Sequence, residues 1–284
     1  MGGDKKLNIA IIWYFDKASK VFDNWRDGHR AAFEVIEKKH DVTWFIDKQV
    51  PDPSDPFDFI ILWDDSNSPF FALADRYNCP IGLCLTTMPS NFDNLHKCSI
   101  VFSESGPVRE AVRAGGIRTI KAFGTDTDFF KPNPKVRKDI PYFYPATFSP
   151  WKRQDELANL GPNLYLVGTI QPDGLEIYQK CTNKGCLIEV GYFPASKILK
   201  MFQRAENVPI PAVHGSERTV LEAMACDILP RVIHPDINPK TYSYVKEYEE
   251  SGMKSPREFV LKYYSHKVFA KNLLKGIKEV LSES

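Results

Sequence analysis

The stretch from His214 to Cys226, which reads His-Gly-Ser-Glu-Arg-Thr-Val-Leu-Glu-Ala-Met-Ala-Cys, has residue types that can bind an anion beside a diol. It follows a predicted strand and opens a predicted helix. Gly215 allows close backbone approach and Ser216 can cap the helix, so the bare N–H groups of its first turn can hold an anion. The carboxylate of Glu222 can accept hydrogen bonds from two vicinal hydroxyls, such as a ribose diol. An ordinary capped helix with Glu217 near its N-terminus is the alternative.

Two acidic segments of the N-terminal half are weaker candidates. Asp64 and Asp65 follow a predicted strand and could pair around a metal, but carboxylates at such a place more often cap the next helix. Trp25 could stack on a sugar ring and Asp27 could bind its hydroxyls. For these two residues a helix cap beside a core aromatic is the alternative.

The cysteines are scattered along the chain, at Cys79, Cys84, Cys98, Cys181, Cys186 and Cys226. None of their spacings is the close pairing of a zinc finger or zinc ribbon. Small buried thiols in a reducing cytosol explain them without a metal. We therefore expect a cytoplasmic protein with no metal site and no resident cofactor.

The charge balance and the apolar content limit the class of protein. The 284 residues include 37 basic and 36 acidic side chains, a net charge of +1, which argues against a dedicated nucleic-acid binder. An apolar fraction of 43% supports a large core. The polar segment 1–6 lacks the apolar stretch of a signal peptide, and no apolar run approaches the roughly 20 residues of a membrane helix. An exposed basic or aromatic patch could still tether the protein to a membrane.

Strand and helix patterns alternate along the first part of the chain. Apolar runs predict strands at 7–13, 42–46, 57–63, 81–85, 99–103 and 118–122, and helical spacing predicts helices at 22–39, 70–77 and 107–114. Strands that alternate with helices indicate βαβ units and a mostly parallel sheet that is covered on both faces.

A segment rich in proline and mixed charge, 123–141, interrupts the alternation and is typical of a linker. The pattern then restarts with strands predicted at 142–148, 163–167, 187–190, 208–213 and 228–233, helices at 152–160, 195–205 and 217–226, and a helical C-terminal stretch. The sequence thus predicts two doubly wound units with a cleft between them as the default ligand site. It contains no Walker A motif and no GxGxxG after the first strand, which disfavours P-loop and ordinary dinucleotide chemistry.

Four stretches, Phe123–Pro132, Ala146–Arg153, Glu222–Cys226 and Tyr263–Ala270, occur in an order and spacing that resemble one enzyme family. The first resembles a linker entry written Gly-Val-Asp-Thr-x-x-Phe-x-Pro, and the second resembles a Gly-Arg-x-Ser-x-x-Lys phosphate loop. The third matches the end of a signature in which a second glutamate precedes Ala-Met-Ala-Cys-Gly, and the fourth resembles a closing helix. Together they resemble the retaining family 4 glycosyltransferases of GT-B fold, over more than half of the chain.

The resemblance implies an α/β fold of two Rossmann-like doubly wound domains with an inter-domain cleft. The N-terminal acceptor-side domain would occupy 1–122 and the nucleotide-sugar-binding domain 123–262. The C-terminal helix, 263–284, would cross back and pack on the first domain.

The resemblance also implies the roles of individual residues. Lys152 would neutralise the donor diphosphate and Glu222 would hold the ribose hydroxyls. With His214, which could still hydrogen-bond a sugar hydroxyl, these are the expected catalytic residues. The other donor-binding residues that it implies are Thr147, Ser149, Arg153, Gly168, Gly191, Tyr192, Gly215, Ser216, Glu217, Arg218 and Thr219. Weaker candidates on the acceptor side are Trp25, Asp27 and Thr86. Such enzymes need no metal, because positive charge and a helix dipole stabilise the leaving diphosphate.

The sequence departs from the family pattern at several positions. These are His214 for the first glutamate, Thr147 for the arginine of the phosphate loop, Ala146 for its glycine, Asp227 for the last glycine of the signature, and Thr86 and Thr87 where a histidine is frequent. Loss of the arginine could remove roughly 1.5–3 kcal/mol of charged hydrogen bonding. Arg153 or Arg218 could compensate.

We therefore predict transfer of a sugar from a nucleoside diphosphate donor, based on UDP or GDP, to a carbohydrate, glycolipid or small-molecule acceptor. No nucleic-acid partner is expected. Two alternatives remain at this point: a non-catalytic nucleotide-sugar-binding protein of the same fold, and a nucleotide-sugar epimerase.

Overall fold

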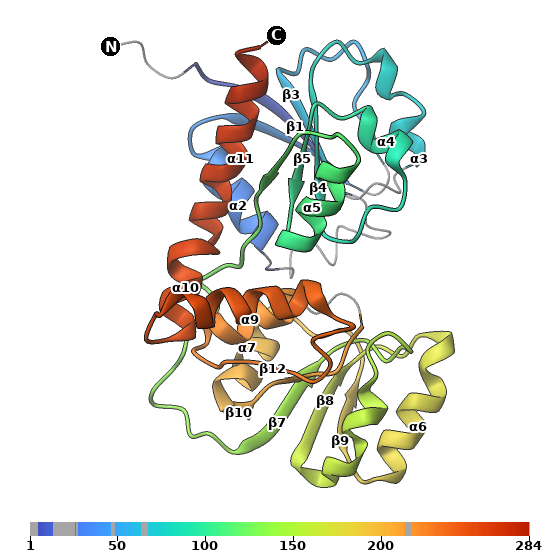
Figure 1. The fold of residues 1–284 in the computed structure, drawn as a ribbon, viewed down its shortest axis with the longest axis vertical. Coiled ribbons are helices and arrows are strands. Elements are labelled where there is room, and N and C mark those ends of the chain that lie inside the picture. The colour runs from blue at the N-terminus through green and yellow to red at the C-terminus, as the bar shows by residue number, and fades with distance from the viewer. Residues whose placement is uncertain are drawn as a thin grey trace. The chain divides into compact units, whose positions relative to one another are not determined.

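The computed structural model describes residues 5–13, 26, 28–46, 49–63, 68–213 and 217–283, with only the backbone described at Ser68 and Glu217. The chain divides into two compact units (Figure 1). The first unit comprises Met1–Gly124 together with His266–Ser284, and the second unit comprises Thr125–Ser265.

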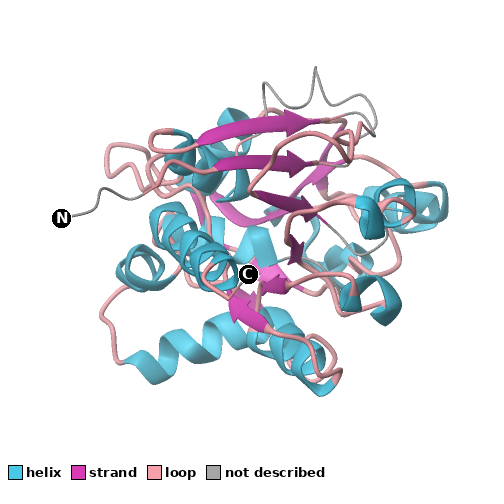
Figure 2. Cartoon of the chain, turned by 90° about the horizontal axis from the view of Figure 1, so that it is seen from above, coloured by secondary structure: helices cyan, strands magenta, loops and turns pink. Residues whose placement is uncertain are grey.

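The first unit contains a parallel sheet with the strand order β2-β1-β3-β4-β5-β6. Its strands are β1 (Asn8–Ile12), β2 (Asp41–Phe45), β3 (Phe59–Trp63), β4 (Ile81–Leu85), β5 (Ile100–Ser103) and β6 (Thr119–Lys121). Its helices are α2 (Gly28–Glu37), α3 (Ser68–Phe71), the 3₁₀ turn η1 (Ala74–Arg76), α4 (Phe92–His96), α5 (Gly106–Ala114) and α11 (His266–Leu281). Neighbouring strand arrows point the same way (Figure 2), as βαβ connections require.

Alternate residues of the central strands enter two separate apolar cores. Ile9 and Ile11 belong to the core on the face covered by α2 and α11, whereas Ala10 and Ile12 belong to the core on the opposite face. All four side chains are buried. This arrangement explains why the strands read as continuous apolar runs in the sequence.

Helix α11 returns to the first unit and packs beside α2 (Figure 1). The ring of Phe269 lies 4.7 Å from the ring of His29, centroid to centroid. Gly276 allows the close approach of α11 to the sheet, because a Cβ atom there would lie 2.7 Å from a ring carbon of Phe102. Arg118 binds Glu279 of the helix at 3.1 Å.

The second unit has a parallel sheet in the order β10-β7-β8-β9 and a parallel pair formed by β11 and β12. These strands are β7 (Ile140–Pro145), β8 (Leu164–Gly168), β9 (Leu187–Val190), β10 (Ala205–Asn207), β11 (Pro209–Ile210) and β12 (Arg231–Val232). Its helices are η2 (Gln154–Asn163), η3 (Pro172–Gly174), α6 (Leu175–Asn183), α7 (Ala195–Arg204), α8 (Glu217–Ala225), α9 (Pro239–Ser251) and α10 (Pro256–Tyr263).

The structure differs from the sequence-based elements at several places. The strand predicted at 142–148 ends at Pro145, and the segment 208–213 contains only the short β11. The helix predicted at 152–160 is the 3₁₀ element η2, whose Gly161 has φ +55° and ψ −132° and precedes Pro162. Helices α4 and α6 and strand β10 were not predicted from the sequence. The start of the helix predicted at 22–39 lies outside the described residues before Gly28, apart from residue 26.

The α/β class, the parallel sheets and the return of the last helix to the first unit are confirmed. None of the described helices combines the length and apolar character that a membrane crossing requires.

Candidate functional site

Most of the predicted donor-binding residues follow the carboxyl ends of parallel strands in the second unit. β7 ends at Pro145, β8 at Gly168 and β9 at Val190. Because the strands are parallel, these ends share one edge of the sheet. We call the residues gathered there the carboxyl-end cluster: Ala146–Arg153, Gly168, Gly191, Tyr192, Ala212, Val213 and Glu217–Glu222.

The loop after β7 continues beside β8 as an extended segment. The amide of Ala146 donates to the carbonyl of Val167 at 3.0 Å, and the amide of Phe148 donates to the carbonyl of Thr169 at 2.8 Å. The hydroxyls of Thr147 and Thr169 lie 3.1 Å apart. The hydroxyl of Thr147 is thus within hydrogen-bond distance of a neighbouring threonine.

Two glycines let this loop lie directly on the backbone that follows β8. A Cβ atom at Gly168 would stand 2.2 Å from the carbonyl oxygen of Ala146, and one at Gly174 would stand 2.0 Å from that of Phe148. Real Cβ contacts are never this short, so neither position has room for a side chain. Close packing of the loop thus accounts for Gly168 without a ligand.

Gln154 holds the loop from within the protein, a role that the sequence analysis missed. Its side chain is fully buried, and its amide nitrogen donates to the carbonyls of Ala146 at 3.2 Å and Thr147 at 2.8 Å. The carbonyl of Ser149 accepts the amide of Lys152 at 2.9 Å, which closes a turn. Lys152 is half-buried in this turn. The Ser149 hydroxyl is buried and has no hydrogen-bond partner among the described residues.

Arg153 has a left-handed backbone, with φ +53°, which is uncommon for a residue with a side chain. Its guanidinium pairs with Glu156. The other carboxylate oxygen of Glu156 lies 2.5 Å from Nε2 of His234. Arg153 therefore forms an ion pair within the second unit.

Helix α8 is joined to the end of β7. The hydroxyl of Thr219 donates to the carbonyl of Pro145 at 3.5 Å. Glu222, one turn further on, is only 4% exposed, and its Oε1 lies 3.4 Å from Nε of Arg218. Burial, with a smaller contribution from the Glu222 carboxylate, raises the pKa of the Cys226 thiol to about 12. His214, Gly215 and Ser216 lie outside the described residues.

The segment that leads to α8 is tied to the loop after β7. The amide of Val213 donates to the carbonyl of Trp151 at 2.7 Å. The side-chain amide of the buried Asn238 donates to the carbonyl of Ala212 at 2.5 Å and accepts the amide of Thr241 at 3.1 Å. Asn238 was not predicted as a site residue, although an asparagine before a proline is a recognised helix-start signal.

Gly191 and Tyr192 complete the cluster beyond β9. The amide of Gly191 donates to the carbonyl of Gly168 at 3.0 Å, and its φ of +143° favours glycine. The ring of Tyr192 is 51% exposed, so it presents an aromatic surface at this edge. The described candidates for donor binding therefore lie in one connected group of strand ends, loops and the first turns of α8.

The acceptor-side candidates belong to the first unit. Thr86 follows β4 directly and is half-buried. Trp25 and Asp27 lie outside the described residues, as do Asp64 and Asp65. Their predicted roles stay predictions.

The cysteines are free thiols. Burial raises the pKa of Cys181 to about 12 and also raises that of Cys84. Within the described part of the chain, no group of three or more His, Cys, Asp or Glu side chains could hold a metal ion.

No protein-family profile matches the chain, and no curated protein matches it in sequence. Solved structures do match in fold. Sucrose-phosphate synthase from Thermosynechococcus elongatus has a TM-score of 0.69 at 13% identity, over 98% of this chain and 100% of that one. AviGT4, a glycosyltransferase involved in avilamycin A biosynthesis, has a TM-score of 0.65 at 13% identity, over 98% and 99%. An α-glucosyltransferase solved with UDP and a 13-mer DNA has a TM-score of 0.61 at 11% identity, over 96% and 100%. The chain therefore has the GT-B fold of these glycosyltransferases.

Proposed function

We propose that the chain is a glycosyltransferase that moves a sugar from a nucleoside diphosphate donor to an acceptor hydroxyl. The observation that carries the proposal is the carboxyl-end cluster, in which hydrogen bonds between loops connect residues that the sequence marks as donor-binding. The likeness in fold to structures solved as glycosyltransferases supports it, and one of those structures contains UDP.

In this proposal each part of the cluster recognises one part of the donor. Lys152 neutralises the diphosphate, and the first-turn amides of α8 receive its distal phosphate. The carboxylate of Glu222 accepts the ribose hydroxyls, which requires it to share its charge with Arg218. The exposed ring of Tyr192 stacks on the base. UDP is the first donor to test.

The proposed transfer needs no metal and retains the anomeric configuration. The acceptor oxygen forms a bond to the anomeric carbon on the face from which the diphosphate leaves. The bond from that carbon to the diphosphate oxygen breaks, and the acceptor proton passes to the leaving diphosphate. Lys152 and the helix dipole of α8 stabilise the charge that develops there. His214, Trp25, Asp27 and Thr86 are the proposed contacts to the transferred sugar and the acceptor.

We further propose that the protein acts in the cytoplasm on a carbohydrate, glycolipid or small-molecule acceptor. Its free thiols support a reducing compartment.

A second candidate function is nucleotide-sugar binding without catalysis. Specific contacts favour it: Thr147 binds Thr169, and Arg153 and Arg218 pair with glutamates. Each of these three side chains, which could contact a diphosphate, is instead bound to a group of the protein.

Calorimetric titration with UDP, GDP and their sugars, followed by product analysis, tests both candidates. The first predicts binding, slow donor hydrolysis and transfer to at least one acceptor, all insensitive to EDTA. Binding with no turnover across a broad acceptor panel would favour the second candidate. Conversion of one donor sugar into another would indicate an epimerase, and absence of nucleotide binding would contradict both proposals.

Two substitutions assign the donor contacts. Lys152→Ala should weaken UDP binding far more than uridine binding, and Glu222→Ala should weaken both by about 1–3 kcal/mol. The control is Lys184→Ala, which removes an exposed lysine of the same unit. Equal effects on UDP and uridine would remove the phosphate role from Lys152.

A further inference from the structure

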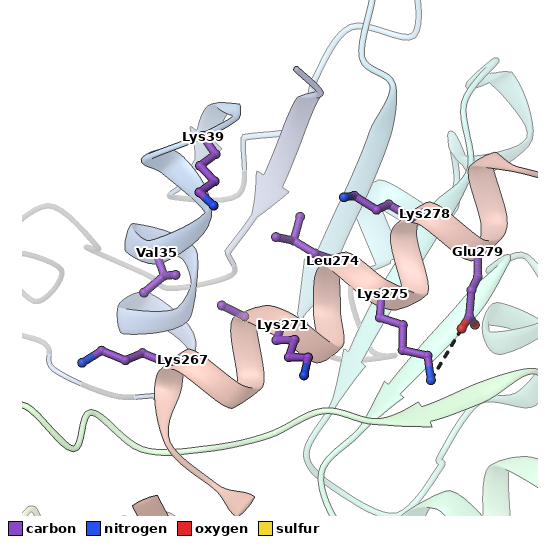
Figure 3. Close-up of a pocket in the computed structure, with 9 residues that line it drawn as sticks. Val35, Lys39, Lys267, Lys271, Leu274, Lys275, Lys278 and Glu279 are labelled. Carbon is purple, nitrogen blue, oxygen red and sulfur yellow. Dashed lines mark ion pairs between the residues drawn. The ribbon is translucent and has the colours of Figure 1, made fainter. Parts of the chain in front are cut away.

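A row of lysines lines one side of the first unit, and none of these lysines is among the residues proposed for catalysis. Lys267, Lys271, Lys275 and Lys278 lie along α11, and Lys39 follows the end of α2. All five side chains are exposed, and together they line a hollow of about 550 Å³ (Figure 3). We call this surface the lysine face.

The lysine face has an apolar floor. Val35 of α2 and Leu274 of α11 face each other across the hollow (Figure 3), and Ala270 also lines it. Val35 and Leu274 are only partly buried, although both contact the core beneath. Lysine side chains can cover such a surface with their aliphatic stems while their ammonium groups stay in water.

The charge of the lysine face is strongly unbalanced. The acidic residue that lines the hollow is Glu279, which also binds Arg118 at 3.1 Å and lies 3.8 Å from Lys275. On α2, Glu34 pairs with Arg26 and Arg30, outside the hollow. A chain of almost zero net charge thus concentrates positive charge on this surface, which is complementary to an anionic partner.

The type and spacing of these cations indicate what kind of anion they fit. Lys267 and Lys278 are separated by roughly 16 Å along a helix that rises 1.5 Å per residue. Arginine is the favoured residue where a single phosphate or a nucleic acid is recognised, because its planar guanidinium makes paired hydrogen bonds. Among the described residues, no arginine lines the hollow. Spread ammonium groups around apolar side chains suit a broad surface of negative headgroups over hydrocarbon.

We propose that the lysine face docks the protein on an anionic phospholipid membrane. The docking is peripheral and depends on salt, because it rests mainly on charge. The proposal is independent of the proposed glycosyl transfer and is tested by binding alone.

Flotation with phosphatidylcholine vesicles, with and without phosphatidylglycerol, tests the proposal. The protein should float with the anionic vesicles, stay behind with the neutral ones and dissociate as salt is raised. Each lysine near an anionic surface contributes about a fivefold change in affinity. The triple variant Lys39→Gln, Lys271→Gln and Lys275→Gln should therefore bind about a hundredfold more weakly.

A matched control removes the same charge elsewhere. Lys131, Lys135 and Lys254 are exposed on the second unit, and their replacement by glutamine should leave vesicle binding within a factor of two or so of the parent. Equal losses in the two triple variants would overturn the proposal, as would absence of binding to anionic vesicles. Tight binding to a DNA or RNA duplex without vesicle binding would also overturn it. Circular dichroism of each variant confirms that it is folded.

Discussion

The two larger sheets of the molecule are both parallel but are held in place by different interactions. In the first unit, the residues of β1, β3, β4 and β5 are nearly all buried between two apolar cores. In the second unit, β9 is an edge strand whose Leu187 and Val190 are each 50% exposed. There, close glycine contacts and the side chains of Gln154 and Asn238 fix the loops. The comparison indicates that apolar packing builds the scaffold, whereas backbone contacts and buried amides shape the candidate site.

The largest expected difference between the two units is in the loss of stability when a close-packed glycine is replaced by alanine. The Cβ of Gly168→Ala would meet a backbone carbonyl at 2.2 Å, whereas that of Gly82→Ala would meet aromatic rings at 2.7 Å. Because rings can shift more easily than paired backbone, we expect Gly168→Ala to lower the free energy of unfolding by about 4 kcal/mol or more and Gly82→Ala by about 1–3 kcal/mol. Urea unfolding measures both.

The control for these two variants is Gly106→Ala at the start of α5, where nothing lies within 4 Å of the added Cβ. Its stability should match that of the parent within about 0.5 kcal/mol. If Gly168→Ala and Gly82→Ala lowered the free energy of unfolding equally, the proposed difference between backbone contacts in the second unit and apolar packing in the first would be contradicted.

Truncation of a buried side chain of α11 should destabilise the first unit without changing UDP binding by the carboxyl-end cluster. Leu273 is fully buried, so Leu273→Ala should cost about 3 kcal/mol through lost contacts and a cavity. UDP affinity of the remaining folded protein should stay unchanged. Exposed Leu261→Ala is the control for stability. A large loss of UDP affinity at low temperature, with folding intact, would show that the first unit also shapes the donor site.

Removal of the buried side-chain amide of Gln154 should lower stability less than the changes above, but it should also weaken UDP binding. Gln154→Ala leaves two partly buried carbonyls without this donor, at a cost of about 2 kcal/mol, and should weaken UDP binding. Gln203→Ala is matched to it, because Gln203 also donates to a carbonyl, that of Lys131, but on the surface. If Gln203→Ala weakened UDP binding as much as Gln154→Ala, the loop would not owe its geometry to Gln154.

The smallest expected effect is on acid stability. Hydrogen bonds from Arg204 lower the pKa of Asp139 below its ordinary value of 3.8. A lowered pKa means that the contribution to stability is complete above the unfolded-state value and is lost as pH falls through the folded-state value. Asp139→Asn should therefore flatten the decline of unfolding free energy below about pH 4. The matched control is Asp173→Asn, which removes an exposed carboxylate of the same unit.

The sequence predicted the scaffold better than the local contacts. Strands such as Ile81–Leu85 and Leu187–Val190 have the predicted bounds, because apolar runs bounded by turn residues define them. Helix α6 was missed because Leu175–Asn183 is mostly polar and only Cys181 is buried in it. Gly161, with φ +55° and ψ −132°, puts a non-helical kink into η2, and helical periodicity in the sequence does not predict such a kink.

The candidate site shows the same limit. Because Ser149 and Gly191 each come after a predicted strand of a parallel sheet, the sequence suffices to place both beyond the carboxyl ends of that sheet. The partners of Gln154 and Asn238 are backbone carbonyls brought close only by folding, so their roles could not be read from residue types. The roles of His214, Trp25 and Asp27 stay predictions, because these residues lie outside the described part of the chain.

The central claim is that the carboxyl-end cluster of the second unit binds a nucleoside diphosphate. Titration of isotope-labelled protein with UDP, followed by amide chemical shifts, tests it most directly. We predict saturable shifts at Lys152, Gly191, Tyr192 and Thr219, with uridine perturbing Lys152 least. Saturable shifts confined to other amides, or no shifts at millimolar UDP, would contradict the claim.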